Sequence, residues 1–305
     1  MQQKHRTVLC DEAVNALNIK SSGTYVDATF GRGGHSKKIL AKLVTGKLLV
    51  IDRDPAAIVE ANALTEKYKN LKVEQGAFEM LKQMIATNFG TKVDGILFDL
   101  GISSPQIDEA QRGFSFNQSG PLDMRMDNSK GETAADWLNQ ASWKDMSRVF
   151  WRYGEEKNAT KIAKEIVLYR QEVKNLETTD ELVGIIEKIN KFSKKHPATR
   201  VFQAIRIHLN RELEQVENVL PTALSTLKKG GRLVVISFHS LEDRIVKRFL
   251  KKQASDGVFD KRMPIAPTEN LATIKIIGKP LKASAQELDA NPRARSAIMR
   301  VAEKL

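Results

Sequence analysis

A glycine-rich turn between a short apolar strand and a helix constrains this chain more than any other feature. Residues 24–36 read TYVDATFGRGGHS. The segment 24–26 favours a buried strand, and the residues after Ser36 favour a helix to about residue 44. Glycines between them let backbone N–H groups approach a ligand at the start of that helix. The stretch predicts a nucleotide-like ligand, and a glycine-rich turn without any ligand is the alternative.

The residues around this turn narrow the choice of ligand. A dinucleotide fingerprint needs a third glycine where Ser36 stands, and a phosphate-binding P-loop needs a Gly-Lys-Ser/Thr sequence that is absent. Asp27 would repel a pyrophosphate, whereas it suits a positive centre such as the sulfonium or ammonium of S-adenosylmethionine (SAM). Asp52 ends the next expected strand, 47–51, where a carboxylate can accept hydrogen bonds from two ribose hydroxyls.

Candidate binding residues recur at the ends of successive expected strands. A third strand at 71–75 is followed by Phe78, whose ring can stack on an adenine or belong to the core. A fourth strand at 93–100 contains Asp99 near its end. Strands that alternate with helices predict a right-handed, mainly parallel sheet, in which ligands bind beyond the carboxyl ends of the strands. We therefore predict an α/β, Rossmann-like fold with Asp27, Gly31, Asp52, Phe78 and Asp99 along one edge.

The pattern changes after the fourth strand. Residues 107–131 have the composition of a loop, and helical periodicity follows, including a capping box of Thr178 with Glu181. A long helix, marked by apolar residues from Phe202 to Val216, is expected to lead back to the sheet, and strands at 273–277 and 297–302 are expected as an edge pair. The predicted domains are 1–106 (SAM-binding, first part), 107–198 (helical insertion, with its three tryptophans in its core) and 199–305 (SAM-binding, second part).

The charge balance favours a polyanionic partner. The 305 residues hold 49 Lys+Arg against 37 Asp+Glu, a formal charge of +12. Residues 1–101 hold 14 basic against 11 acidic residues, so the remaining 35 and 26 carry most of the excess. Residues 188–211 contain seven Lys or Arg and no acidic residue. A one-signed run of this kind favours contact with RNA phosphates over a merely solvated surface.

The cysteine count and the lack of long apolar runs indicate where in the cell the protein is expected. Cys10 is the single cysteine, which excludes an intramolecular disulfide and a cysteine-cluster metal site. The N-terminal residues lack the apolar core of a signal peptide, and no run approaches the ~18 apolar residues of a membrane span. We therefore expect a cytoplasmic protein that does not bind a membrane.

Several long motifs, taken in order, resemble the RsmH (MraW) family of bacterial methyltransferases, which act on a cytosine exocyclic amine in small-subunit (16S) ribosomal RNA. The resemblance covers nearly the whole chain. The motifs are HRTVL at 5–9, TFGRGGHS at 29–36, DRDP at 52–55, DLGISSPQ at 99–106, RGFSF at 112–116, DMRMD at 123–127, HPATRVFQAIR at 196–206, SFHSLEDR at 237–244 and NPRARS at 291–296.

The resemblance implies a class I SAM-dependent methyltransferase sheet with an inserted all-helical domain. It also implies that SAM is the cofactor, with S-adenosylhomocysteine as the product. By the family's pattern the residues that contact SAM are Gly33, Gly34, His35, Asp52, Phe78, Asp99 and Gln106. The strand-end argument reaches most of these independently, whereas His35 and Gln106 come from the resemblance alone.

The chemistry of the reaction suggests further residues. A cytosine amino group is a poor nucleophile because its lone pair is delocalised, so methylation needs in-line approach to the sulfonium methyl and acceptors for the N–H groups. We expect Asp99 with Ser103 or Ser104 as acceptors. Other amino-methyltransferases carry an aromatic residue where Gln106 stands, so Phe114 and Phe116 are candidates for base stacking. No metal is required, because the sulfonium is already activated.

The expected partner is 16S rRNA, held within the small subunit, and a homodimer is left open. The residues expected to hold flanking phosphates are Arg200, Arg206, Arg293 and Arg295. Two other functions compete: a DNA amino-methyltransferase, and a non-catalytic SAM-binding ribosome-assembly factor. A nicotinamide-dependent dehydrogenase fits least, given Asp27 and Ser36.

Overall fold

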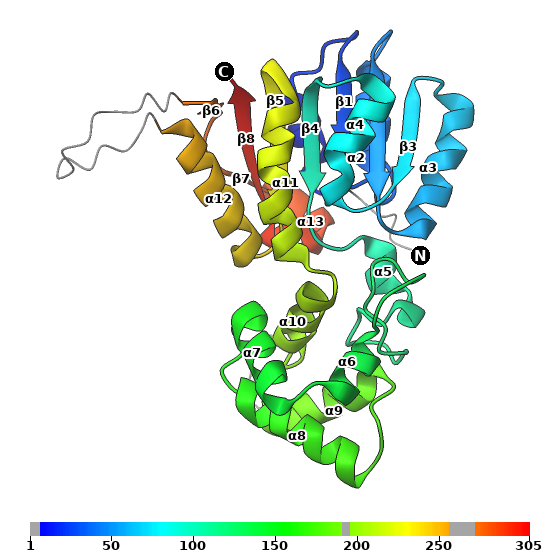
Figure 1. Ribbon diagram of the computed structural model, residues 1–305, viewed down its shortest axis with the longest axis vertical. Coiled ribbons are helices and arrows are strands. Elements are labelled where there is room, and N and C mark those ends of the chain that lie inside the picture. The colour runs from blue at the N-terminus through cyan, green and yellow to red at the C-terminus, as the bar shows by residue number, and fades with distance from the viewer. Residues whose placement is uncertain (1–6, 191–195, 256–271) are drawn as a thin grey trace, which may run out of the picture. The chain divides into compact units, whose positions relative to one another are not determined.

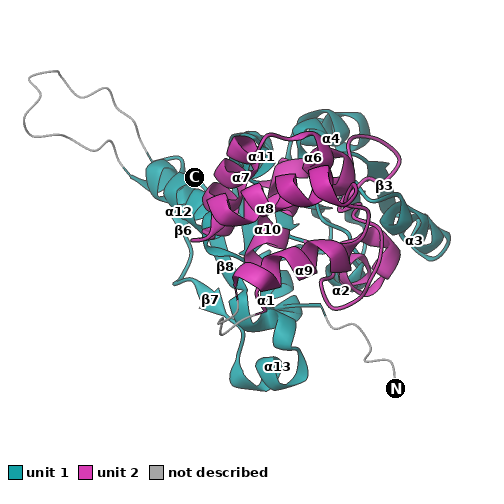
Figure 2. Ribbon diagram, turned by 90° about the horizontal axis from the view of Figure 1, so that it is seen from below, with its two compact units in different colours: residues 1–101, 213–305 teal, residues 102–212 magenta. Residues whose placement is uncertain are grey.

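The computed structural model describes residues 7–190, 196–255 and 272–305. The chain divides into two compact units, which Figure 2 colours separately. Residues 1–101 and 213–305 form the first, here called the sheet unit, and residues 102–212 form the second, here called the helical unit. His5 and Arg6 of the first motif lie outside the described residues, as do Lys191, Lys194 and Lys195 of the basic run.

The sheet unit is built on a sheet with strand order β3-β2-β1-β4-β5-β8-β6, and β7 pairs with β8 (Figure 1). Its strands are β1 (Thr24–Asp27), β2 (Lys47–Asp52), β3 (Leu71–Gln75), β4 (Val93–Asp99), β5 (Leu227–Ser237), β6 (Ile274–Ile276), β7 (Leu281–Lys282) and β8 (Ile298–Lys304). Strands β1 to β5 pair in parallel, and β8 pairs antiparallel with β5, β6 and β7. The chain order reverses between β1 and β4, which makes their carboxyl ends the switch point of the sheet.

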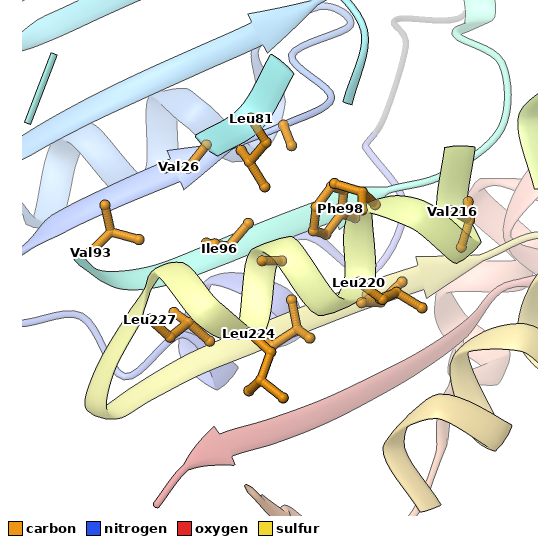
Figure 3. Packing of buried hydrophobic residues seen from close by; sticks show 14 of the residues in the cluster. Val26, Leu81, Val93, Ile96, Phe98, Val216, Leu220, Leu224 and Leu227 are labelled. Atoms are coloured by element: carbon orange, nitrogen blue, oxygen red, sulfur yellow. The ribbon is translucent and has the colours of Figure 1, made fainter. Parts of the chain in front are cut away.

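Helices cover both faces of this sheet. Apolar residues of α4 (Leu81–Phe89), α11 (Glu212–Thr226) and α12 (Ser240–Ala254) pack on one face. In Figure 3 the side chains of Val216, Leu220 and Leu224 on α11 lie against those of β4. The other face is covered by α1 (Cys10–Ala16), α2 (Gly34–Lys42), α3 (Pro55–Lys67) and α13 (Ala285–Ala290). Burial on both faces explains why the central strands read as continuous apolar runs.

The helical unit has its own core, formed by apolar side chains of its helices and of the loop before them. Its helices are α5 (Ser104–Asp108), α6 (Ala134–Gln140), α7 (Trp143–Gly154), α8 (Ala159–Glu172), α9 (Thr179–Ile189) and α10 (Thr199–Leu209). The capping box expected at Thr178 and Glu181 is present at the start of α9. Trp137 is buried, but Trp151 is 69% exposed, so the prediction that all three tryptophans form the core was wrong for Trp151.

The expected long helix is instead two helices, α10 and α11, separated at Asn210 and Arg211. Arg211 has a positive φ of 50°, which ends a right-handed helix. Asn210 holds this break, because its side chain donates to the Met124 carbonyl and accepts from the Met126 N–H, both at 2.8 Å. Helix α10 packs against α7 and so belongs to the helical unit. The structural boundaries therefore fall at 101/102 and 212/213, where the sequence suggested 106/107 and 198/199.

The expected edge pair of late strands also differs from the structure. Strands β6 and β8 pair antiparallel as expected, but β8 is an inner strand because it also pairs with β5 from Arg232–Glu303 to Ser237–Ile298. Only β6 lies at that end of the described strand order. Within the described parts of the chain, no helix is long and apolar enough to cross a membrane.

Candidate functional site

Three carboxylates lie at the ends of three adjacent strands. Asp27 ends β1, Asp52 ends β2 and Asp99 ends β4, and β1 lies between the other two strands. Asp27 pairs with Val50 on one side and Leu97 on the other, so Asp52 and Asp99 each extend two residues further. The structure thus brings together the row of acidic residues that the sequence placed along one edge.

The glycine turn connects this row to α2. The Gly31 N–H donates to Oδ2 of Asp52 at 2.8 Å, which ties the turn to the end of β2. Gly33 precedes α2 with a φ of 70°, and a Cβ there would lie 2.7 Å from the Phe30 ring. A Cβ on Gly34 would overlap Oγ1 of Thr7. Both glycines therefore leave room for backbone and side chains packed closely around the turn, in addition to any contact with a ligand.

Asp52 and Asp27 hold the local backbone in different ways. Asp52 accepts from Gly31 through Oδ2 and from the Asp54 N–H through Oδ1 at 2.9 Å, and burial still raises its pKa. Asp27 is fully buried and accepts from the Ser36 hydroxyl at 2.6 Å and the Thr29 N–H at 3.2 Å. Burial raises the pKa of Asp27 to about 7, against the effect of these hydrogen bonds. The Arg53 N–H is a third backbone donor to Asp52, and the about four acceptor positions of a carboxylate leave at least one for a ligand hydroxyl.

His35 and Asp99 meet beside this row. Nδ1 of His35 lies 3.7 Å from Oδ2 of Asp99. Burial lowers the pKa of His35 to about 4, so the ring is neutral at pH 7. Burial, with the charges of Asp27 and Glu242, raises the pKa of Asp99 well above its usual value. Among the described residues, neither Nε2 of His35 nor Oδ1 of Asp99 has a hydrogen-bond partner, although both atoms are buried.

These features fit a ligand that carries a positive charge and hydroxyl groups. Carboxylates with raised pKa values gain free energy from a nearby cation, because it favours their charged forms. The unpartnered atoms of His35 and Asp99 can pair with polar groups of a ligand, since buried polar atoms are rarely left unsatisfied. Phe78 lies in a short 3₁₀ helix (Phe78–Met80) after β3, partly buried, with its ring edge-to-face on Phe98 at 5.4 Å. SAM has this combination of a sulfonium, a ribose and an adenine.

The remaining residues predicted to act near the methyl group begin the helical unit. Ser103 precedes α5, and Ser104 is its first residue. Oε1 of Gln106 accepts the Ser103 N–H at 2.9 Å in a capping box, so Gln106 orients the first turn of α5. This hydrogen bond gives Gln106 a role within its own helix that the family resemblance did not imply.

The aromatic candidates for base stacking are occupied inside the helical unit. Phe114 is 6% exposed within that unit's core. Phe116 stacks on His196 with ring centroids 4.4 Å apart and packs edge-to-face on Phe202. Phe114 is therefore covered, and His196 occupies one face of the Phe116 ring.

Sequence reasoning missed an aromatic ring in the sheet unit. Phe238 follows β5, whose last residues pair with those of β4, and a Cβ on Gly101 would lie 3.5 Å from Cδ2 of Phe238. The Phe238 N–H donates to Oε2 of Glu242 at 2.8 Å, which fixes its backbone, and the ring is only partly buried. The signal was the motif SFHSLEDR itself, which starts at the carboxyl end of β5 next to Asp99.

The arginines expected to contact RNA fall into two groups. Arg200, on α10, is exposed, as are Arg293 and Arg295 in a 3₁₀ helix (Pro292–Ser296) of the sheet unit. Arg206 instead forms a two-pronged ion pair with Glu212, through Nε at 2.9 Å and Nη2 at 3.0 Å. Its guanidinium is largely buried and is engaged within the helical unit.

Comparison with known proteins gives consistent matches over the whole chain. The family model described as the MraW methylase family matches residues 2–305. Proteins named ribosomal RNA small subunit methyltransferase H are similar: that of Dechloromonas aromatica is 50% identical over 306 residues (99% of this chain, 98% of the relative). That of Shewanella loihica is 50% identical over 307 residues (99% and 97%). A solved rRNA methylase of Streptococcus thermophilus matches with a TM-score of 0.40 and 12% identity, covering 97% of this chain and 93% of that one.

Proposed function

Because this chain belongs to the MraW methylase family over its whole length, we propose that it is a SAM-dependent methyltransferase that acts on 16S rRNA of the small ribosomal subunit. The observation that carries the proposal is the row of Asp27, Asp52 and Asp99 beside the glycine turn, at the switch point of the sheet. The matched family supplies the reaction class, and this row supplies a place for its donor.

The residues of the sheet unit would hold SAM by complementary interactions. Asp52 would accept hydrogen bonds from the ribose hydroxyls while it keeps the Gly31 and Asp54 N–H bonds. Phe78 would lie against the adenine, and Asp27 with Asp99 would favour the positive charge. When bound, SAM supplies a methyl group on a sulfonium that is already a good leaving group. His35, being neutral, does not oppose this cation.

We assign the exocyclic N4 amine of a cytosine, in the decoding region of the subunit, as the target. The unpartnered Oδ1 of Asp99 would accept a hydrogen bond from an N–H of the amine, which draws the nitrogen lone pair out of conjugation and orients it toward the methyl group. The same bond favours the departure of the proton after transfer. Ser103 and Ser104 stay predicted as further acceptors.

The target base needs an aromatic or apolar surface as well as a polar acceptor, because a base that leaves its stack loses stacking energy. Phe238 is the partly buried ring beside Gly101, two residues after Asp99. We therefore assign base stacking to Phe238 in place of Phe114 and Phe116. Gly101 has a φ of 98° and no side chain to cover the ring.

Arg200, Arg293 and Arg295 are exposed and would hold phosphates on either side of the target. The reaction would take place in the cytoplasm. Whether the chain forms a homodimer is a separate question, which light scattering at working concentration tests. The assembled subunit, rather than naked RNA, is the proposed substrate.

The experiment that tests this function supplies labelled SAM to the purified protein with small-subunit particles, naked 16S rRNA or DNA. Transfer to the particles supports the proposal. Preferential transfer to DNA would favour a DNA amino-methyltransferase, and SAM binding without turnover on any substrate would favour a non-catalytic assembly factor.

A further inference from the structure

The sheet unit carries a strongly basic surface at the β6 end of the sheet, away from the row of aspartates. It is formed by two segments that pack together, the C-terminal part of α12 (residues 244–255) and residues 272–283, which include β6 and β7. Neither segment contains an acidic residue. Arg244 and seven further basic side chains are exposed here. We call these seven the basic edge surface: Lys247, Arg248, Lys251, Lys252, Lys275, Lys279 and Lys282.

Among the described residues, the acidic side chains near this surface are engaged elsewhere. Asp243 forms a two-pronged ion pair with Arg300, at 2.7 and 2.9 Å, and Glu303 pairs with Arg232 at 2.7 Å. Glu242 is buried at the start of α12, where it accepts backbone N–H groups. Within the described ranges, no ion pair engages Lys247, Lys251 or Lys279.

The arrangement of these charges opposes the stability of the folded chain. Lys247 and Lys251 are four residues apart on one helix face, as are Arg248 and Lys252, and like charges at this spacing repel each other. The dipole of α12 offsets this repulsion for the last turn only. A surface that concentrates one sign of charge in this way is suited to a polyanion, which relieves the repulsion.

The surface also has a hollow with an apolar floor. Lys247, Lys251 and Lys279 border a pocket of about 180 Å³. Its floor is formed by Leu250, Ile276, Ile277, Pro280 and Val301. Ile276 is 45% exposed although it is a large apolar residue on the end strand β6. The floor can take a ribose or an unpaired base while the ammonium groups contact the phosphates beside it.

We propose that the basic edge surface is a second RNA-binding site, which contacts the phosphates of a single-stranded rRNA segment distinct from the methylated one. The inference deepens the proposed function, because it takes the polyanion to be the rRNA substrate. RNA is favoured over an acidic protein because the cations extend beyond the pocket along α12, β6 and β7, as a phosphate backbone requires and a single acidic side chain does not. The site adds affinity and orientation without contacting the donor or the target base.

The test compares two triple variants of the full-length protein. In the first, Lys247→Gln, Lys251→Gln and Lys279→Gln remove the cations around the pocket. In the matched control, Lys67→Gln, Lys69→Gln and Lys72→Gln remove three exposed lysines at the opposite end of the sheet, where Glu66 and Glu74 lie close in sequence. Both lose the same charge. The measured quantity is the affinity for labelled oligouridylate as a function of salt, with SAM affinity and melting temperature as checks on folding.

The first variant should bind oligouridylate about tenfold more weakly, and the slope of log K against log salt should fall by about 2. SAM affinity should match that of the wild type, and the melting temperature should be equal or slightly higher, because the variant loses the repulsion between Lys247 and Lys251. An RNA affinity and slope no different from those of the control variant would overturn the proposal. The proposal would also be overturned if the wild type bound polyglutamate as tightly as oligouridylate and the first variant lost both affinities to the same extent. The partner would then be an acidic protein.

The failure of the proposed function is distinguishable from the failure of this inference. In one case the wild-type protein binds oligouridylate through the basic edge surface and yet transfers no methyl group to small-subunit particles. That result would support the RNA site and contradict the enzymatic role. In the opposite case the wild-type protein methylates the particles, and the first variant is as active as the control at every particle concentration. That result would contradict the RNA site and support the enzymatic role.

Discussion

Nδ1 of His35 lies 3.7 Å from Oδ2 of Asp99, and the far nitrogen of the histidine and the other oxygen of the aspartate are both buried without a partner in the described residues. The histidine is neutral at pH 7, because burial lowers its pKa to about 4. A bound cation would stabilise the charged form of Asp99, whose pKa is raised, and the neutral His35 ring would not repel it. This pair connects the glycine turn to the strand end where the target amine is proposed to bind.

Asp52→Ala should weaken SAM binding by about 1–3 kcal/mol, because the variant loses charged hydrogen bonds to the ribose and also releases the Gly31 N–H. Calorimetry measures the change. Asp94→Ala is the matched control, since Asp94 lies on β4 toward its amino end and contacts Thr24 and Lys228 instead. Wild-type SAM affinity in the Asp52 variant would remove this residue from the site.

Asp27→Asn should raise the unfolding free energy above about pH 7 and weaken SAM binding. The folded-state pKa of about 7 exceeds the ordinary 3.8, so the ligand-free protein binds this proton more tightly than the unfolded chain between those values. Its unfolding free energy therefore falls as the pH rises through that window, and the asparagine variant escapes this loss.

Urea unfolding at about pH 5 and about pH 8 measures this effect. Between the two pH values, the unfolding free energy of the variant relative to that of the wild type should rise by about 1–4 kcal/mol. SAM affinity at the higher pH should be lower in the variant, because one negative charge near the sulfonium is gone. A pH-independent stability difference would mean that Asp27 does not titrate in this range.

Gly34→Ala should weaken SAM binding, because the added methyl group overlaps Oγ1 of Thr7 and must displace Thr7 or the glycine turn. The double variant Thr7→Gly with Gly34→Ala should recover part of the loss, and Thr7→Gly alone sets the reference for this cycle. The same loss in single and double variants would show that the methyl group interferes with SAM directly.

Phe238→Leu should lower kcat/KM for the particles by about tenfold or more, which corresponds to the ~1–3 kcal/mol of one base–aromatic stacking contact. Phe238→Tyr should retain most of the activity, and SAM affinity should not change in either. Phe249→Leu on α12, which removes a ring packed against the core, is the control for stability. Equal losses of kcat/KM in the Phe238 and Phe249 leucine variants would argue against stacking.

Arg206→Gln should destabilise the helical unit by about 3 kcal/mol, because it leaves Glu212 largely buried without its cation. Arg200→Gln, at an exposed position on the same helix, should leave the melting temperature unchanged and lower RNA affinity instead. Thermal unfolding and RNA titration of both variants check the assignment. An Arg206 variant that melts like the wild type but loses RNA affinity would restore the role predicted from sequence.

Much of the fold could be predicted because the local signals agree with the tertiary structure. Strand β3 has the bounds expected from sequence, 71–75, because its residues mark a strand without help from distant contacts. The inner position of β8 could not be predicted, because strand order depends on pairing with β5 and not on local sequence. The break at Asn210 was also hidden, since the apolar spacing of α10 continues into α11 while the hydrogen bonds to Met124 and Met126 decide the end of the helix.

The candidate site divides in the same way. Asp27, Asp52 and Asp99 were accessible from sequence, because carboxyl ends of parallel strands share an edge. Phe238 was missed because its contact with Gly101 joins residues 137 positions apart. Arg206 and Phe116 looked like free functional side chains, since sequence does not reveal that Glu212 and His196 engage them.

The most direct test is to incubate small-subunit particles with the purified protein and isotopically labelled SAM, and then to locate the methyl group by nuclease digestion and mass spectrometry. The account predicts one labelled N4-methylcytidine in 16S rRNA for the wild type and almost none for Asp99→Asn, with that variant still folded. A label on another atom or another nucleic acid, or undiminished transfer by Asp99→Asn, would contradict it.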